Sequence, residues 1–207
     1  SQVRTYKRNR GMTYVELMVV LAIFVTMTSI VLFDYGKFEK KINIKNLANT
    51  VALKIVEAQK AALSGKLPTL AFSPAWIPSY GILINASNPT NKFTYFADLN
   101  NSSKNNTSLP TETRQNGDYD LGEELEVFRL GSKYVIHEVR FYRGGAPSGN
   151  KVTSGMTITF TRPDTSAYYK NIASENAYDF IEITVSSIDG SEKGYIRVYP
   201  SGRIQIN

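Results

Sequence analysis

Hydrophobic side chains are distributed very unevenly along this chain of 207 residues. Residues 12–33 are almost entirely apolar, and Glu16 is the only charge among them. The uninterrupted part, residues 17–33, has three polar members: Thr26, Thr28 and Ser29. As an α-helix this part would be about 26 Å long, close to the thickness of the hydrocarbon core of a bilayer. The pattern therefore predicts a membrane-spanning helix near the N-terminus.

Two other interpretations of this segment are less favoured. A core helix of a soluble domain is usually apolar on one face, whereas this segment is apolar all round. A secretory signal peptide has the same order of basic and then apolar residues, but here the apolar run is long and no small-residue cleavage site follows it. Because basic residues precede the segment, we expect its N-terminus in the cytoplasm and its C-terminal side across the membrane.

An amphipathic helical pattern follows the apolar segment. Its apolar positions are spaced by three or four residues: Ile44, Ala48, Val51, Ile55, Ala58 and Ala62. Ser64, Gly65 and Pro68 then end the pattern. One helix over residues 12–64, in which Gly36 permits a bend, would be about 80 Å long. We expect its second half to cover a sheet.

The rest of the chain has the alternating pattern of β-strands. The expected strands are residues 80–85, 92–99, 125–130, 134–142, 157–161, 180–186, 195–199 and 203–207. Residues 100–120 and 143–154 lack periodicity, and we expect both to be long loops. One long helix followed by strands predicts the α+β class, with the helix packed on an antiparallel sheet.

Composition adds two constraints. The absence of cysteine excludes disulfides, Cys-ligated zinc, iron–sulfur clusters and thiol catalysis. The net charge of +6 would suggest nucleic acid or an anionic surface, but four of the 24 basic residues lie in residues 1–11, which contain no acid. Without these four, the chain has 20 basic and 18 acidic residues, which gives a net charge of +2. Much of the basic excess is therefore a signal for membrane topology.

The junction between the basic leader and the apolar helix reads GMTYVE over residues 11–16. It resembles the prepilin cleavage and methylation motif of type IV pilins and pseudopilins. The resemblance implies that a prepilin peptidase cuts between Gly11 and Met12, that the new Met12 amine is methylated, and that Glu16 is the fifth mature residue. Met12 and Tyr14 stand where the family usually has Phe and Leu, and both replacements are large and apolar.

The resemblance also implies a pilin fold with a defined division of the chain. Residues 1–11 would be the leader, 12–38 the membrane-spanning and filament-core half of the helix, 39–65 its amphipathic half, and 66–207 a β-rich head.

Assembly of such subunits would depend on Thr13 and Glu16. The resemblance implies that Glu16 of one subunit neutralises the Met12 amine of another. Paired charges in an apolar bundle define registry more than they add stability. The implied partners are other pilin subunits, the prepilin peptidase and the membrane.

Residues 46–207 are similar to minor pilins of the GspH/FimT-like type. The similar stretches are NLANTVALKIVEAQKAALSG, SYGILI, FTYFADLN, TITFTRP and IRVYPSGRIQI. This similarity implies a structural subunit, a minor pilin or pseudopilin of a prokaryotic type IV pilus or type II secretion-like filament. It would lie in the inner membrane before assembly and in an extracellular or periplasmic filament afterwards. The sequence does not distinguish a subunit of a motility pilus from one of a competence pilus or a secretion pseudopilus.

An acidic loop is a candidate Ca²⁺ site, although we expect no obligatory cofactor. Asp98 and Asn100 follow one expected strand, and Asp118, Asp120 and Glu123 precede the next. Side-chain oxygens at alternate positions suit Ca²⁺, which takes six to eight oxygen ligands. The glycine of an EF-hand loop is missing, and a solvated polar loop with Asx turns is the favoured alternative.

The C-terminal strands carry a candidate DNA-binding cluster, Lys193, Arg197 and Arg203. Some FimT-like pilins bind DNA through a basic Gly-Arg-x-Arg sequence, but here Gln205 replaces the second arginine. Phosphate contacts need only nearby cations. A solvated strand face is the favoured alternative.

Nothing in the sequence points to an enzyme. His137 is the only histidine, which leaves no partners for a catalytic triad or a histidine metal site. Nucleophile-elbow, P-loop and dinucleotide-binding motifs are absent. A structural subunit is therefore the first hypothesis, and the rival is a membrane-tethered or pilus-tip module that binds DNA or a surface ligand.

Overall fold

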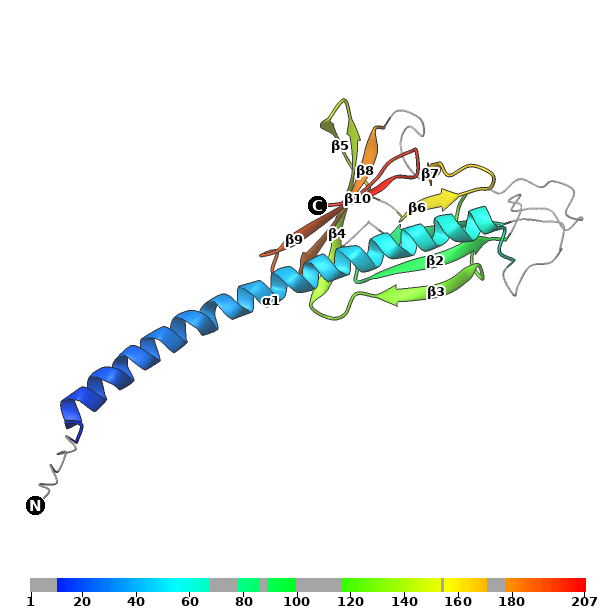
Figure 1. Ribbon diagram of the computed structural model, residues 1–207. Helices are drawn as coiled ribbons and strands as arrows, with labels where there is room; N and C mark the ends of the chain where they lie inside the picture. The colour runs from blue at the N-terminus through cyan, green and yellow to red at the C-terminus, as the bar shows by residue number, and fades with distance from the viewer. Residues whose placement is uncertain (1–10, 68–77, 86–88, 100–116, 154, 171–177) are drawn as a thin grey trace, which may run out of the picture. The chain divides into compact units, whose positions relative to one another are not determined.

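The computed structural model describes residues 11–67, 78–85, 89–99, 117–153, 155–170 and 178–207 (Figure 1). They contain α1 (Tyr14–Ser64) and the strands β1 (Ser79–Asn85), β2 (Lys92–Asp98), β3 (Glu124–Arg129), β4 (Tyr134–Arg143), β5 (Ala146–Lys151), β6 (Gly155–Phe160), β7 (Ala167–Lys170), β8 (Phe180–Ser187), β9 (Lys193–Val198) and β10 (Ile204–Ile206). The chain divides into two compact units, Ser1–Lys40 and Lys41–Asn207. The predicted α+β class is confirmed.

Helix α1 ends at Ser64 in a glycine-dependent C-terminal cap. The backbone N–H of Lys66 donates to the carbonyl of Ala61, and that of Gly65 donates to Ala62, both at 3.1 Å. Gly65 has a φ of 62°, which a residue without Cβ adopts at little cost. This is the Schellman arrangement, and it satisfies carbonyls that the last turn leaves without partners. The predicted helical segment is confirmed, and it continues without interruption through Gly36.

The first sheet has the strand order β3-β2-β1-β6-β7. Its pairings are antiparallel, with β1 in the middle opposite both β2 and β6. Tyr80, Ile82 and Ile84 of β1 are fully buried on one side of this sheet. On the other side Gly81 lies beneath the ring of Phe96, where a Cβ would come within 3.1 Å of the ring and 2.5 Å of the Ile158 carbonyl oxygen.

The second sheet has the strand order β10-β9-β8-β4-β5, again antiparallel. Ile181, Ile183 and Val185 of β8 are fully buried, and the side chains between them lie on the opposite face. The alternation follows from the period of two along a strand.

A single hydrophobic cluster joins both sheets to the C-terminal half of α1. The helix contributes Ile44, Ala48, Val51, Ala52, Ile55, Ala58, Ala61 and Ala62. The helix approaches β9 closely at Gly194, where an added Cβ would lie 3.0 Å from the Ile44 side chain. The predicted apolar stripe is therefore core packing, as its spacing indicates.

Three details differ from the sequence-based predictions. There are two five-stranded sheets, not one. Residues 143–154 are not a long loop, because Gly144 and Gly145 have φ values of 63° and 76° and join β4 to β5 in a tight hairpin. Two consecutive residues with positive φ are typical of the type I′ turn that matches strand twist. The short edge strand β7 was also not predicted.

Candidate functional site

The start of α1 is held by reciprocal hydrogen bonds between Thr13 and Glu16. The Glu16 carboxylate accepts from the backbone N–H and the hydroxyl of Thr13, each at 3.0 Å. The backbone N–H of Glu16 donates to the Thr13 hydroxyl at 3.3 Å. This is a capping box, which satisfies N–H groups that the first turn leaves without partners. Gly11 and Met12 precede the helix, and both residues are exposed.

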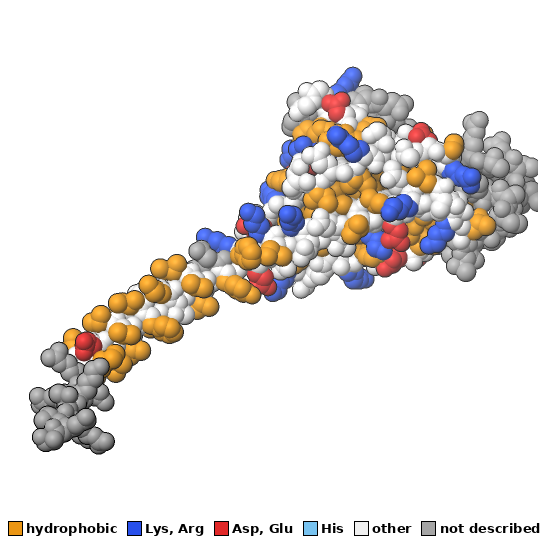
Figure 2. All heavy atoms as spheres, viewed as in Figure 1, with side chains coloured by type: hydrophobic (Ala, Val, Ile, Leu, Met, Phe, Trp, Pro, Cys, Tyr) orange, Lys and Arg blue, Asp and Glu red, His pale blue; other side chains and the backbone are white. Residues whose placement is uncertain are grey.

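The following part of α1 is a candidate membrane span. Within the described residues, α1 is the one helix long and apolar enough to cross a bilayer, and none of its most apolar 18-residue window is buried. The described side chains of residues 12–32 are all exposed. Figure 2 shows hydrophobic side chains covering this part of the helix. An apolar surface of this extent needs a covering of lipid or protein.

The hydroxyl groups within the span are satisfied by the helix itself. Thr26 donates to the carbonyl of Ile23 at 2.8 Å, and Thr28 donates to that of Phe24 at 2.7 Å. Ser29 donates to the carbonyl of Val25 at 2.8 Å. Each hydroxyl therefore has a partner without water, which a helix surrounded by hydrocarbon requires.

The described acidic residues proposed for Ca²⁺ lie at the end of β2, which is Asp98, and in the segment 118–123 that leads into β3. Asp98 has no exposed surface, and one of its oxygens accepts from the backbone N–H of Gly117 at 2.9 Å. Its other oxygen, Oδ1, has no hydrogen-bond partner among the described residues. Burial, and then the charges of Glu123, Asp120 and Asp118, raise the pKa of Asp98 to about 7.

Glu123 uses its carboxylate to hold this loop together. One oxygen accepts from the backbone N–H of Leu99 and the other from that of Asp120, both at 2.8 Å. Asp118 forms an ion pair with Lys170 at 3.6 Å. Among the residues that the structure describes, no group of three or more acidic or histidine side chains is arranged to hold a metal ion. Asn100 lies outside the described residues, and Ca²⁺ binding stays a prediction.

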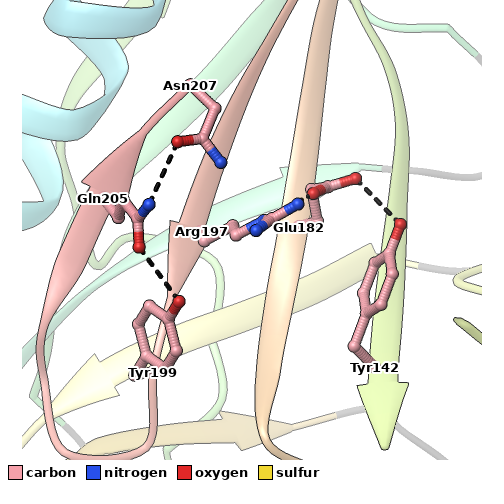
Figure 3. A network of polar contacts seen from close by, with 6 residues as sticks. All are labelled: Tyr142, Glu182, Arg197, Tyr199, Gln205 and Asn207. Atoms are coloured by element: carbon pink, nitrogen blue, oxygen red, sulfur yellow. Dashed lines mark hydrogen bonds and ion pairs between the residues drawn. The ribbon is translucent and has the colours of Figure 1, made fainter. Parts of the chain in front are cut away.

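The three candidate DNA-binding residues lie on β9 and beside β10. Lys193 and Arg203 are exposed, whereas Arg197 is engaged within the sheet. The Nε–H of Arg197 donates to Glu182 of β8 at 2.8 Å, and the hydroxyl of Tyr142 of β4 donates to the other oxygen of Glu182 at 3.0 Å. Figure 3 shows these contacts across neighbouring strands. The hydrogen bond to Glu182 raises the pKa of Arg197 further above its ordinary value.

Aromatic rings on the same face stack against one another and against the arginines. Phe180 stacks on Tyr142, with 4.6 Å between ring centroids. The guanidinium of Arg197 lies 4.9 Å from the centroid of Phe180, and that of Arg203 lies 3.8 Å from that of Tyr199. These cation–π and ring contacts occupy ring faces that a nucleic-acid base would otherwise stack on.

Sequence reasoning missed Glu182 as the partner of Arg197. The signal was present in the turn at Asp189 and Gly190, because a hairpin centred there places residue 182 opposite residue 197.

The described residues thus define an α+β protein with a long N-terminal helix, two antiparallel sheets and a candidate membrane anchor. Comparison with protein-family models, curated proteins and solved structures gives no match.

Proposed function

We propose that this chain is a pilin-like structural subunit, a minor pilin or pseudopilin without catalytic activity. The observation that carries the proposal is the order of features at the N-terminus. The exposed residues Gly11 and Met12 precede a capping box at Thr13 and Glu16, and an exposed apolar helical segment follows. The helix then turns amphipathic and enters the core of a β-rich head, as the pilin fold requires.

The two parts of α1 have different tasks in this proposal. The apolar part holds the subunit in the membrane and, after extraction, packs among the same parts of other subunits. Cleavage after Gly11 keeps this part in the mature chain and creates an amine at Met12. In the dry interior of a bundle, that amine requires an anion, and Glu16 supplies it. A wrong registry would leave both charges unpaired, so the pair selects one arrangement.

Incorporation into filaments tests this proposal. Glu16→Ala is expected to leave the head folded and the protein in the membrane, but to lower its amount in sheared surface filaments at least tenfold. Glu39→Ala is the matched control, because Glu39 is an exposed acid on the same helix beyond the apolar run. Equal incorporation of both variants and the wild type would contradict the proposed role of Glu16.

The alternative is a membrane-tethered module for DNA or a surface ligand. Lys193 and Arg203 are exposed on the second sheet and could contact phosphates. A salt-sensitive shift of double-stranded DNA by the purified chain, lost in Lys193→Gln with Arg203→Gln, would support it. No shift at low salt would rule it out.

A further inference from the structure

Two exposed tyrosines mark the ends of the apolar part of α1. Tyr14 in the first turn is 74% exposed, and Tyr35 is 66% exposed. They are separated by 21 residues in a continuous helix, which places them about 31 Å apart along its axis. The hydrocarbon core of a bilayer is about 30 Å thick, so the two rings are spaced to reach its two surfaces.

The distribution of charged residues between and beyond the two tyrosines agrees with a membrane span that ends at them. Between the tyrosines the only charges are Glu16, close to the first of them, and Asp34, directly before the second. Beyond Tyr35 charged residues become frequent, beginning with Lys37 and Glu39. Tyrosine is enriched at membrane–water interfaces because its ring is apolar and its hydroxyl remains hydrated.

We propose that Tyr14 and Tyr35 are the interfacial anchors that set the depth of this helix in the bilayer before assembly. The inference rests on the proposed membrane-anchored state. It places Glu16 about 3 Å along the axis from the Tyr14 level, at the edge of the hydrocarbon. A carboxylate there can stay near the head groups, whereas one at the centre of the bilayer would be strongly disfavoured. Phe24 and Val25 then lie at the midplane.

The absence of cysteine allows a direct measurement of depth. The full chain with Val25→Cys carries a single thiol, which is labelled with a fluorophore and reconstituted in phosphatidylcholine–phosphatidylglycerol vesicles. Quenching by lipids with nitroxides at known depths is expected to place this label at the midplane. Labels at positions 15 and 34, which leave both tyrosines in place, are expected about 14 Å from it.

Removal of each anchor tests the proposal itself. In the Val25→Cys chain, Tyr14→Ala and Tyr35→Ala should each move the label away from the midplane by about 2–4 Å, up to two or three residues of helix rise. Tyr168→Ala is the control, since Tyr168 is an exposed tyrosine of the β-rich unit and should not move the label.

The outcomes separate this inference from the proposed function. An inserted helix whose depth is the same in both tyrosine variants would overturn the anchoring role alone. A label that no lipid quenches would show that the helix is not in the bilayer, and would overturn the membrane-anchored state as well. Contact of position 35 with a second copy, detected as a disulfide between Tyr35→Cys chains in place of lipid quenching, would also overturn the inference.

Discussion

The carboxylate of Glu16 accepts two hydrogen bonds from Thr13, from its backbone N–H and from its hydroxyl, each at 3.0 Å. The Thr13 hydroxyl also accepts from the backbone N–H of Glu16 at 3.3 Å. Thr13→Ala removes this acceptor and should therefore fray the first turn of α1. The expected cost is about 1 kcal/mol, or roughly fivefold faster amide hydrogen exchange at Leu17 and its neighbours in detergent micelles. Thr28→Ala is the control, because its hydroxyl caps no helix end. Equal exchange in both variants would show that the cap is not formed.

Asp98 should make the β-rich unit less stable as the pH rises. Its pKa is raised from the ordinary value of 3.8 to about 7 in the folded chain, so between these values the folded state binds more protons than the unfolded state. Its contribution is fully present below pH 3.8 and is lost as the pH approaches 7, by at most about 1.4 kcal/mol per pH unit.

Asp98→Asn isolates this effect, because the amide oxygen can still accept from Gly117 but does not titrate. The difference in unfolding free energy between Asp98→Asn and the wild type, from denaturant titrations, should change in favour of the variant between pH 4 and pH 7. A difference that is constant over this range would mean that Asp98 has an ordinary pKa.

The contact between Glu182 and Arg197 should stabilise the second sheet. Glu182 is nearly buried, and Arg197→Ala would leave its carboxylate with the Tyr142 hydroxyl as its one side-chain donor among the residues that the structure describes. The expected loss is about 1–3 kcal/mol of unfolding free energy. Arg203→Ala should cost less than about 1 kcal/mol, since its cation–π contact with Tyr199 is exposed. A larger loss of unfolding free energy in Arg203→Ala than in Arg197→Ala, measured by denaturant titration, would contradict this stabilising role of the Glu182–Arg197 contact.

Gly81 should not accept a side chain. An added Cβ would lie 2.5 Å from the carbonyl oxygen of Ile158 and 2.7 Å from a methyl carbon of Thr159, which the central strand cannot relieve without moving. Gly81→Ala is expected to cost about 1–3 kcal/mol. Gly155→Ala, in the neighbouring strand, meets only an ordinary contact at 3.5 Å with Leu83 and should change stability by less than about 1 kcal/mol. Equal melting temperatures of Gly81→Ala and Gly155→Ala would show that β1 and β6 can move apart at little cost.

The local patterns of the sequence were sufficient for the helix and most strands. The spacing from Ile44 to Ala62 predicted the buried face of α1, because periodicity depends on neighbouring residues only. The division into two sheets was not predictable in the same way. It depends on pairings such as β1 with β6, which lie far apart in the chain. Strand β5 was missed because glycines that form a hairpin turn also occur in loops.

The candidate sites show the same limit. The sequence placed Glu16 and Thr13 three residues apart in a helix, and their contact follows directly from that spacing. The pairing of Arg197 with Glu182 was missed, although the turn at Asp189 and Gly190 indicates the register of β8 and β9 in which the pair forms. The sequence did not reveal that Asp98 is buried, since burial depends on contacts between distant parts of the chain, such as the one between Asp98 and Gly117.

The N-terminus of the protein in its native cells tests the central proposal most directly. Intact-mass and peptide analysis of the membrane and filament fractions should find a chain that begins at Met12 and carries one methyl group on its α-amine. A chain in assembled filaments that still carries residues 1–11 would contradict prepilin-type processing, and with it the proposed role of this protein as a pilin-like subunit.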